Sequence, residues 1–113
     1  MADLVQIKQL KIKTGVVKRL IKEYQSYQKQ VQKDEEKAAK LKNEATNEDE
    51  EYVAKKAQDV VRETISMVRD TQGRLSKAVQ DLQTLLSSVE FSEESAELKE
   101  AKEYLENAST VIA

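Results

Sequence analysis

The sequence predicts an all-α fold, an elongated antiparallel three-helix bundle of coiled-coil character. Three observations favour it: apolar residues recur at helical spacing, 35% of the residues are charged, and the 113-residue chain has 2 glycines and no proline. Aromatic residues make up only 4% of the chain, which is typical of long helices and not of sheets. With 39% hydrophobic residues, we expect one narrow core and a single domain over residues 1–113.

The first helix is predicted over residues 4–44. Apolar side chains occupy one heptad position from Leu10 to Ala38, which gives the helix one apolar face. A helix of this length is typical of an extended bundle. Because Tyr24 and Tyr27 lie in the apolar stripe, we expect their rings in the core with the hydroxyl groups at its edge.

The second helix is predicted over residues 47–88. A break in the pattern precedes Asn47, which has the spacing of a capping box with Glu50 three residues later. The apolar stripe that follows keeps its heptad register from Ala54 to Val89.

The third helix is predicted over residues 92–111, with Ser92 as its N-terminal cap. Its apolar stripe runs from Leu98 to Ile112. Short connections favour antiparallel neighbours, and therefore an up-down-up bundle. The third stripe is thin, so a long two-helix hairpin that dimerises into a four-helix bundle is the alternative, and both a monomer and a homodimer remain open.

The composition restricts the chemistry that this chain can perform. It contains no histidine and no cysteine, which excludes Ser-His-Asp triads, cysteine nucleophiles and zinc–thiolate sites. The acidic run over residues 48–51 lacks the ligand spacing of a calcium loop and is better explained by helix capping. We expect no enzymatic activity, no metal and no cofactor.

Localisation follows from what the chain does not contain. No apolar stretch approaches the ~20 residues that span a bilayer, and the first residues do not resemble a signal peptide. Together with the lack of cysteine, this predicts a cytoplasmic protein that does not enter a membrane.

Charge is distributed unevenly along the chain. Residues 1–42 contain 11 Lys and Arg against 5 Asp and Glu, whereas residues 43–113 contain 8 against 16. The basic first third could attract an acidic partner, while the acidic remainder would repel nucleic acid and anionic membranes.

The basic residues of the first helix gather opposite its apolar stripe. A solvated helix surface is the ordinary explanation of such a charge run, but a solvated face normally carries both signs, and Glu36 is the single acid here. We predict that this face binds a partner protein, with Ile12 as an exposed apolar anchor. The predicted binding residues are Lys11, Ile12, Lys18, Arg19, Lys22, Lys29 and Lys33.

One segment carries a family resemblance. The sequence Lys11-Ile12-Lys13-Thr14-Gly15-Val16-Val17-Lys18-Arg19-Leu20 resembles the opening signature of the tubulin-specific chaperone A family, also called tubulin-binding cofactor A. The similarity continues in the second helix at Asp70, Gln72 and Arg74, and is weakest after Val89. The family often carries proline where this chain has Arg69, so we expect a helix without a proline kink here.

The resemblance implies a three-helix cofactor that captures β-tubulin released from cytosolic chaperonin. It further implies passage of β-tubulin to other tubulin-folding cofactors and assembly of the αβ-tubulin heterodimer, without catalysis or nucleotide. Tubulins are acidic, which suits the basic face. From the residues alone, a structural coiled-coil adaptor that binds partner helices through its apolar seam remains the alternative.

Overall fold

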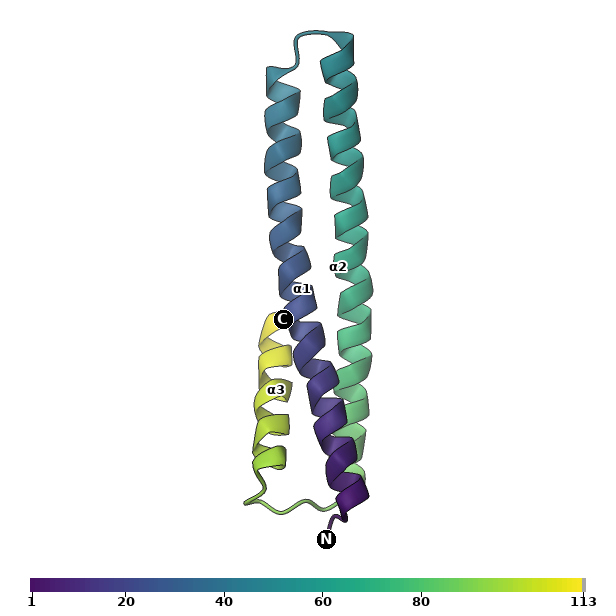
Figure 1. Cartoon of the computed structure of the whole chain (residues 1–113), viewed down its shortest axis with the longest axis vertical. Helices are drawn as coiled ribbons and strands as arrows, with labels where there is room; N and C mark the ends of the chain where they lie inside the picture. The colour runs from purple at the N-terminus through teal and green to yellow at the C-terminus, as the bar shows by residue number, and fades with distance from the viewer. Residues whose placement is uncertain (113) are drawn as a thin grey trace. The chain divides into compact units, whose positions relative to one another are not determined.

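The computed structural model describes residues 1–112 and contains three helices (Figure 1). They are α1 (Leu4–Glu44), α2 (Glu48–Ser88) and α3 (Ala96–Ile112), and no strand occurs among the described residues. The predicted all-α, three-helix fold is confirmed. The helix α2 continues without interruption through Arg69 and Gly73, as expected for a helix that contains no proline.

Side chains close the N-terminal ends of the two long helices. At the start of α1, the backbone N–H of Gln6 donates to Asp3 Oδ1 at 2.8 Å, and the N–H of Asp3 donates to Gln6 Oε1 at 3.0 Å. At the start of α2, the N–H of Glu50 donates to Asn47 Oδ1 at 2.9 Å, which confirms Asn47 as the N-cap. The reciprocal bond to Glu50 Oε1 comes from the backbone N–H of Thr46 at 3.3 Å and not from that of Asn47. Thr46 Oγ1 strengthens this cap by donating to Glu50 Oε1 at 2.7 Å.

The start of α3 differs from the prediction, because the helix begins at Ala96 and not at residue 92. Ser92 instead begins a turn, in which the N–H of Ser95 donates to the carbonyl oxygen of Ser92 at 3.0 Å. Ser95 is the N-cap, since its Oγ accepts the N–H of Leu98 at 3.3 Å. The physical reason is Phe91, which is buried in the core, so the chain turns once more before a helix can bring Leu98 to the same core.

The helices contribute to two compact units. One unit comprises Met1–Glu23 together with the chain from Thr71 onward, and the other comprises Tyr24–Asp70. We refer to them as the three-helix unit and the two-helix unit. No helix among the described residues is both long and apolar enough to cross a membrane.

The three-helix unit contains the main hydrophobic core. Within it, α1 and α3 run in one direction and α2 in the other (Figure 1). Leu10 and Val17 of α1 and Leu75 and Leu82 of α2 have no exposed surface, as expected from their places in the predicted stripes. The remaining buried members of this core are Leu20, Ile21, Ala78, Phe91, Leu98, Ala101 and Ala108.

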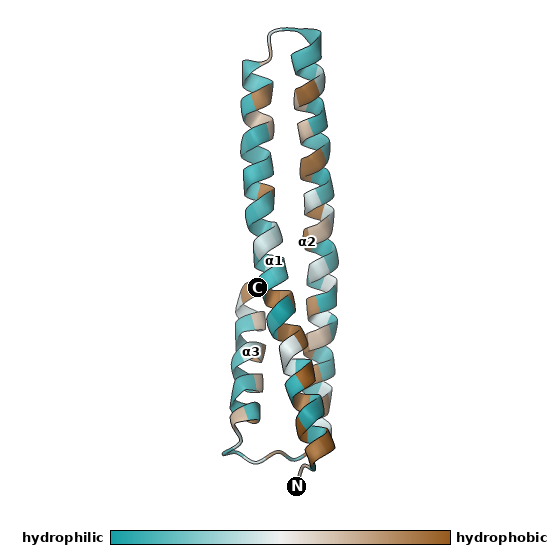
Figure 2. Cartoon of the chain, in the orientation of Figure 1, coloured by the Kyte–Doolittle hydropathy of each residue, from teal (hydrophilic) through white to brown (hydrophobic). Residues whose placement is uncertain are grey.

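The two-helix unit is an antiparallel pair formed by the second half of α1 and the first half of α2. Figure 2 shows fewer hydrophobic residues on this half of α1 than on its first half. Tyr24 is buried, as predicted, and Tyr27 is half-buried. Thr64 ties the two helices together, because its buried hydroxyl donates to Asp34 Oδ2 at 2.7 Å.

Candidate functional site

The predicted basic face of α1 falls on both units. Lys11, Ile12, Lys18, Arg19 and Lys22 lie in the three-helix unit. Lys29 and Lys33 lie in the two-helix unit, where both are exposed. The basic face therefore consists of two separate surfaces, one on each unit.

The helix α3 occupies one side of the basic face. Lys18 is half-buried, and its Nζ lies 5.7 Å from the centre of the Tyr104 ring, a cation–π contact. On the same side, the pKa of the Glu97 carboxyl is lowered mainly by a hydrogen bond from its own backbone N–H, then by Ser95, with a smaller contribution from the charge of Lys11. Lys11 and Lys18 thus lie toward α3, and Lys18 is partly engaged inside the molecule.

The other side of the basic face borders a groove between α1 and α2. It has a volume of about 530 Å³ and no residue of α3 lines it. Two of the predicted residues, Ile12 and Arg19, belong to it. The full lining is Ile12, Lys13, Val16, Arg19, Leu20, Glu23, Arg74, Lys77, Ala78 and Asp81.

The groove combines an apolar floor with a basic rim. Leu20 and Ala78 are buried and Val16 is half-buried, while 58% of Ile12 is exposed at the edge. Four of the lining residues are cationic and two are acidic, so the groove is positive. Among the described residues, no carboxylate lies within ion-pair distance of any of the four cations.

Arg74 and Lys77 of α2 were missed as candidate binding residues by reasoning from the sequence. Both are exposed residues of a helix whose polar surface carries charges of both signs, so neither stands out in a heptad projection. Their importance arises from the register between α1 and α2, which places them beside Arg19. No local signal in the sequence reports that register.

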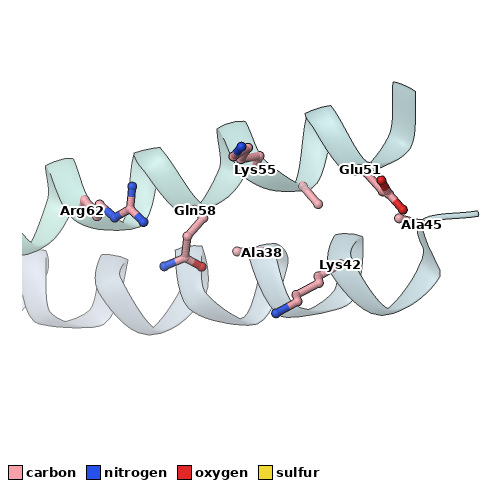
Figure 3. A pocket seen from close by; sticks show the side chains of 8 residues that line it. Ala38, Lys42, Ala45, Glu51, Lys55, Gln58 and Arg62 are labelled. Atoms are coloured by element: carbon pink, nitrogen blue, oxygen red, sulfur yellow. The ribbon is translucent and has the colours of Figure 1, made fainter. Parts of the chain in front are cut away.

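A second hollow, in the two-helix unit, has a volume of about 590 Å³. Figure 3 shows its side chains spread along the two helices, with Gln58 reaching from α2 toward Ala38 on α1. The lining is Ala38, Lys42, Ala45, Glu51, Ala54, Lys55, Gln58 and Arg62. These groups do not converge on one point, and the described residues contain no group of three acidic side chains that could hold a metal ion.

Comparison with known proteins gives the family. A model of the family described as tubulin binding cofactor A matches residues 5–105. The chain belongs to this family. Within the tubulin binding cofactor A family, the tubulin-specific chaperone A of Mus musculus is 43% identical over 107 residues, which cover 95% of each chain. The resemblance inferred from the segment between Lys11 and Leu20 is thereby confirmed.

Solved structures of the tubulin binding cofactor A family share the fold. The crystal structure of tubulin folding cofactor A from Arabidopsis thaliana matches with a TM-score of 0.85 at 31% identity, over 96% of this chain and 99% of that one. Human tubulin chaperone cofactor A matches with a TM-score of 0.75 at 39% identity, over 92% of this chain and 98% of that one. The three-helix arrangement is therefore a property of the family and not of this chain alone.

Proposed function

We propose that this protein is a cytoplasmic tubulin-folding cofactor that captures β-tubulin released from chaperonin and stabilises it for assembly of the αβ-tubulin heterodimer. The observation that carries the proposal is the family match over residues 5–105, together with relatives named as tubulin-specific chaperones and a tubulin-folding cofactor. The mechanism is protection by occupancy, in which a helical surface covers a face of β-tubulin and later yields it to another tubulin-folding cofactor. Such a mechanism needs no catalysis, because competing affinities set capture and release.

The proposed binding surface is the basic face of α1. Lys11, Ile12, Arg19 and Lys22 are exposed in the three-helix unit, so they are available to a partner. A positive surface attracts an acidic protein and speeds the encounter. Lys18 is half-buried against Tyr104, so we assign it a smaller share of the contact than its place in the sequence suggests.

The test is a capture assay with three separate partners: β-tubulin released from denaturant, α-tubulin, and the native heterodimer. We expect selective recovery of β-tubulin. Replacing Lys22 and Arg19 by glutamate should weaken capture and leave the helical circular dichroism unchanged. The matched control is Arg69→Glu with Lys99→Glu, which changes the net charge equally at exposed residues of α2 and α3 outside the basic face. A chain that recovers none of the tubulin forms would contradict the proposed function.

The rival hypothesis, a coiled-coil adaptor, requires an apolar seam that becomes buried only when a partner helix binds. In the three-helix unit, the seam residues Leu10, Val17, Leu75 and Leu82 are fully buried within a single chain. A partner helix could reach them only if the unit opened. Sedimentation discriminates further, because a folded monomer of 12.9 kDa excludes the adaptor, whereas a dimer is compatible with both hypotheses.

A further inference from the structure

We propose that the groove between α1 and α2 in the three-helix unit binds an acidic segment of the partner that also inserts one apolar side chain. The inference rests on the proposed function for the identity of the partner, and it names the part of the surface that recognises it. The residues that carry it are Ile12, Val16, Arg19, Arg74 and Lys77.

The apolar part of the argument starts from Ile12. Isoleucine in a helix that packs a core normally faces that core, yet 58% of Ile12 is exposed at the edge of the groove. Beside it lie half-buried Val16 and buried Leu20, which form a continuous apolar floor. An apolar side chain placed on this floor would remove Ile12 and Val16 from water, which is the typical role of an anchor at the centre of an interface.

The charged part of the argument concerns the two walls of the groove. Lys13 and Arg19 come from α1, and Arg74 and Lys77 come from α2, so carboxylates in the groove meet cations from both sides. The two acids, Glu23 and Asp81, leave the lining with two more positive than negative side chains. Since none of these cations forms an ion pair within the described chain, they are available to a partner's carboxylates.

Two other hollows lack one part of this combination. The one that contains Lys29, of about 460 Å³, is lined by that lysine and the glutamines Gln25, Gln28 and Gln32, without an apolar side chain. The hollow of Figure 3 has only alanines as apolar lining. The groove is therefore the place on the basic face where charge and an exposed apolar anchor occur together.

The first experiment compares two double charge reversals that change the net charge equally. Arg19→Glu with Arg74→Glu alters the two walls of the groove, whereas Arg69→Glu with Lys99→Glu alters two exposed cations of α2 and α3 outside both the groove and the basic face. We expect the groove variant to bind β-tubulin about tenfold more weakly or worse, and the control variant to lose less than about threefold. Equal losses, or no loss in the groove variant, overturn the proposal. Circular dichroism of both variants verifies that they are folded.

The second experiment does not depend on tubulin. A short synthetic peptide with one leucine among glutamates is titrated into the isotopically labelled protein, and amide chemical shifts are followed by NMR. We expect shifts concentrated at Ile12, Val16 and Arg74, and smaller shifts when glutamine replaces the leucine. Shifts located elsewhere, or equal shifts for both peptides, overturn the proposal.

The two experiments separate the failure of the groove from the failure of the function. If the natural chain captures β-tubulin and the groove variant captures it equally well, only the groove proposal fails. If the natural chain captures no tubulin but the leucine peptide shifts the groove amides, the proposed function fails while the groove remains a binding site for acidic, apolar segments.

Discussion

At the scale of single residues, Thr14 is the exception in an otherwise apolar core. Its hydroxyl is buried, and among the described residues it is the one buried side-chain oxygen without a hydrogen-bond partner. A buried polar group without a partner costs about 1–3 kcal/mol relative to a solvated one. Thr14 therefore lowers the stability of the three-helix unit.

We predict that Thr14→Val raises the free energy of unfolding by about 1 kcal/mol, because valine has the same shape without the unpaired hydroxyl. Chemical denaturation followed by circular dichroism measures the effect. Thr84→Val is the matched control, since the Thr84 hydroxyl is exposed and donates to the carbonyl oxygen of Gln80 at 2.9 Å. A stability equal to or lower than that of the natural chain would show that Thr14 has a partner in solution.

A second residue-scale feature is the carboxyl of Asp34. Its pKa is lowered first by the hydrogen bond from Thr64 and then by the one from Gln30, with a smaller contribution from the charge of Lys37. Because the pKa is lower in the folded than in the unfolded state, the carboxylate stabilises the fold above its ordinary pKa. That contribution is lost as the pH falls through the lowered value.

We predict that Thr64→Val raises the pKa of Asp34 toward its ordinary value, as measured by NMR titration of the carboxyl carbon. Thr64→Ser keeps the hydroxyl and should keep the pKa low. The same pair of variants should differ in acid unfolding, with the valine variant losing less stability than the serine variant as the pH falls below the ordinary aspartate range. An identical Asp34 pKa in the two variants would rule out the hydroxyl as the main cause.

At the scale of the elements, α3 depends on its cap. The helix has 17 residues, against 41 each for α1 and α2, so its ends are a larger part of it. Ser95 closes its N-terminus by accepting the N–H of Leu98 and by donating to Glu97 Oε2 at 2.9 Å. The Ser92 hydroxyl, in the preceding turn, accepts the N–H of Glu94 at 3.3 Å and no N–H of α3.

We predict that Ser95→Ala lowers the free energy of unfolding by about 1 kcal/mol, while Ser92→Ala changes it by less than about 0.5 kcal/mol. Thermal unfolding of both variants gives the comparison. A larger loss of stability in Ser92→Ala than in Ser95→Ala would indicate that α3 begins at Ser92, as predicted from the sequence.

At the scale of the whole molecule, α3 completes the core of the three-helix unit. Leu98, Ala101 and Ala108 are its buried residues, and Phe91 in the preceding connection is buried with them. Without them, Leu10 and Val17 of α1 would lose part of their cover. The short third helix therefore contributes more to stability than its length suggests.

We predict that a chain ending at Val89 loses roughly 3 kcal/mol or more of unfolding free energy, because the burial of Leu98 and Phe91 alone contributes about 1.5–3 kcal/mol each. Denaturation in guanidinium chloride measures the loss, and binding of a hydrophobic dye reports the newly exposed core. An unchanged denaturation midpoint would mean that α1 and α2 form the core by themselves.

Much of the fold could be predicted because it follows from residue patterns that are local in the sequence. The apolar stripes located all three helices, and the spacing of Asn47 and Glu50 located the start of α2 to within one residue. Ser92 was mistaken for the cap of α3 because serine followed by acids is a cap signal wherever it occurs. The burial of Phe91, a tertiary interaction, decided in favour of Ser95.

The sequence by itself determined the helical fold, the buried seams and the concentration of positive charge on α1, since each follows from residue spacing along one helix. Only the tertiary structure decided which part of that charge remains available: Lys18 lies against Tyr104 of α3, whereas Arg19 shares a groove with Arg74 of α2. The physical reason is that a heptad specifies which side of a helix is buried, but the neighbour on each remaining side depends on the register of helices distant in the chain.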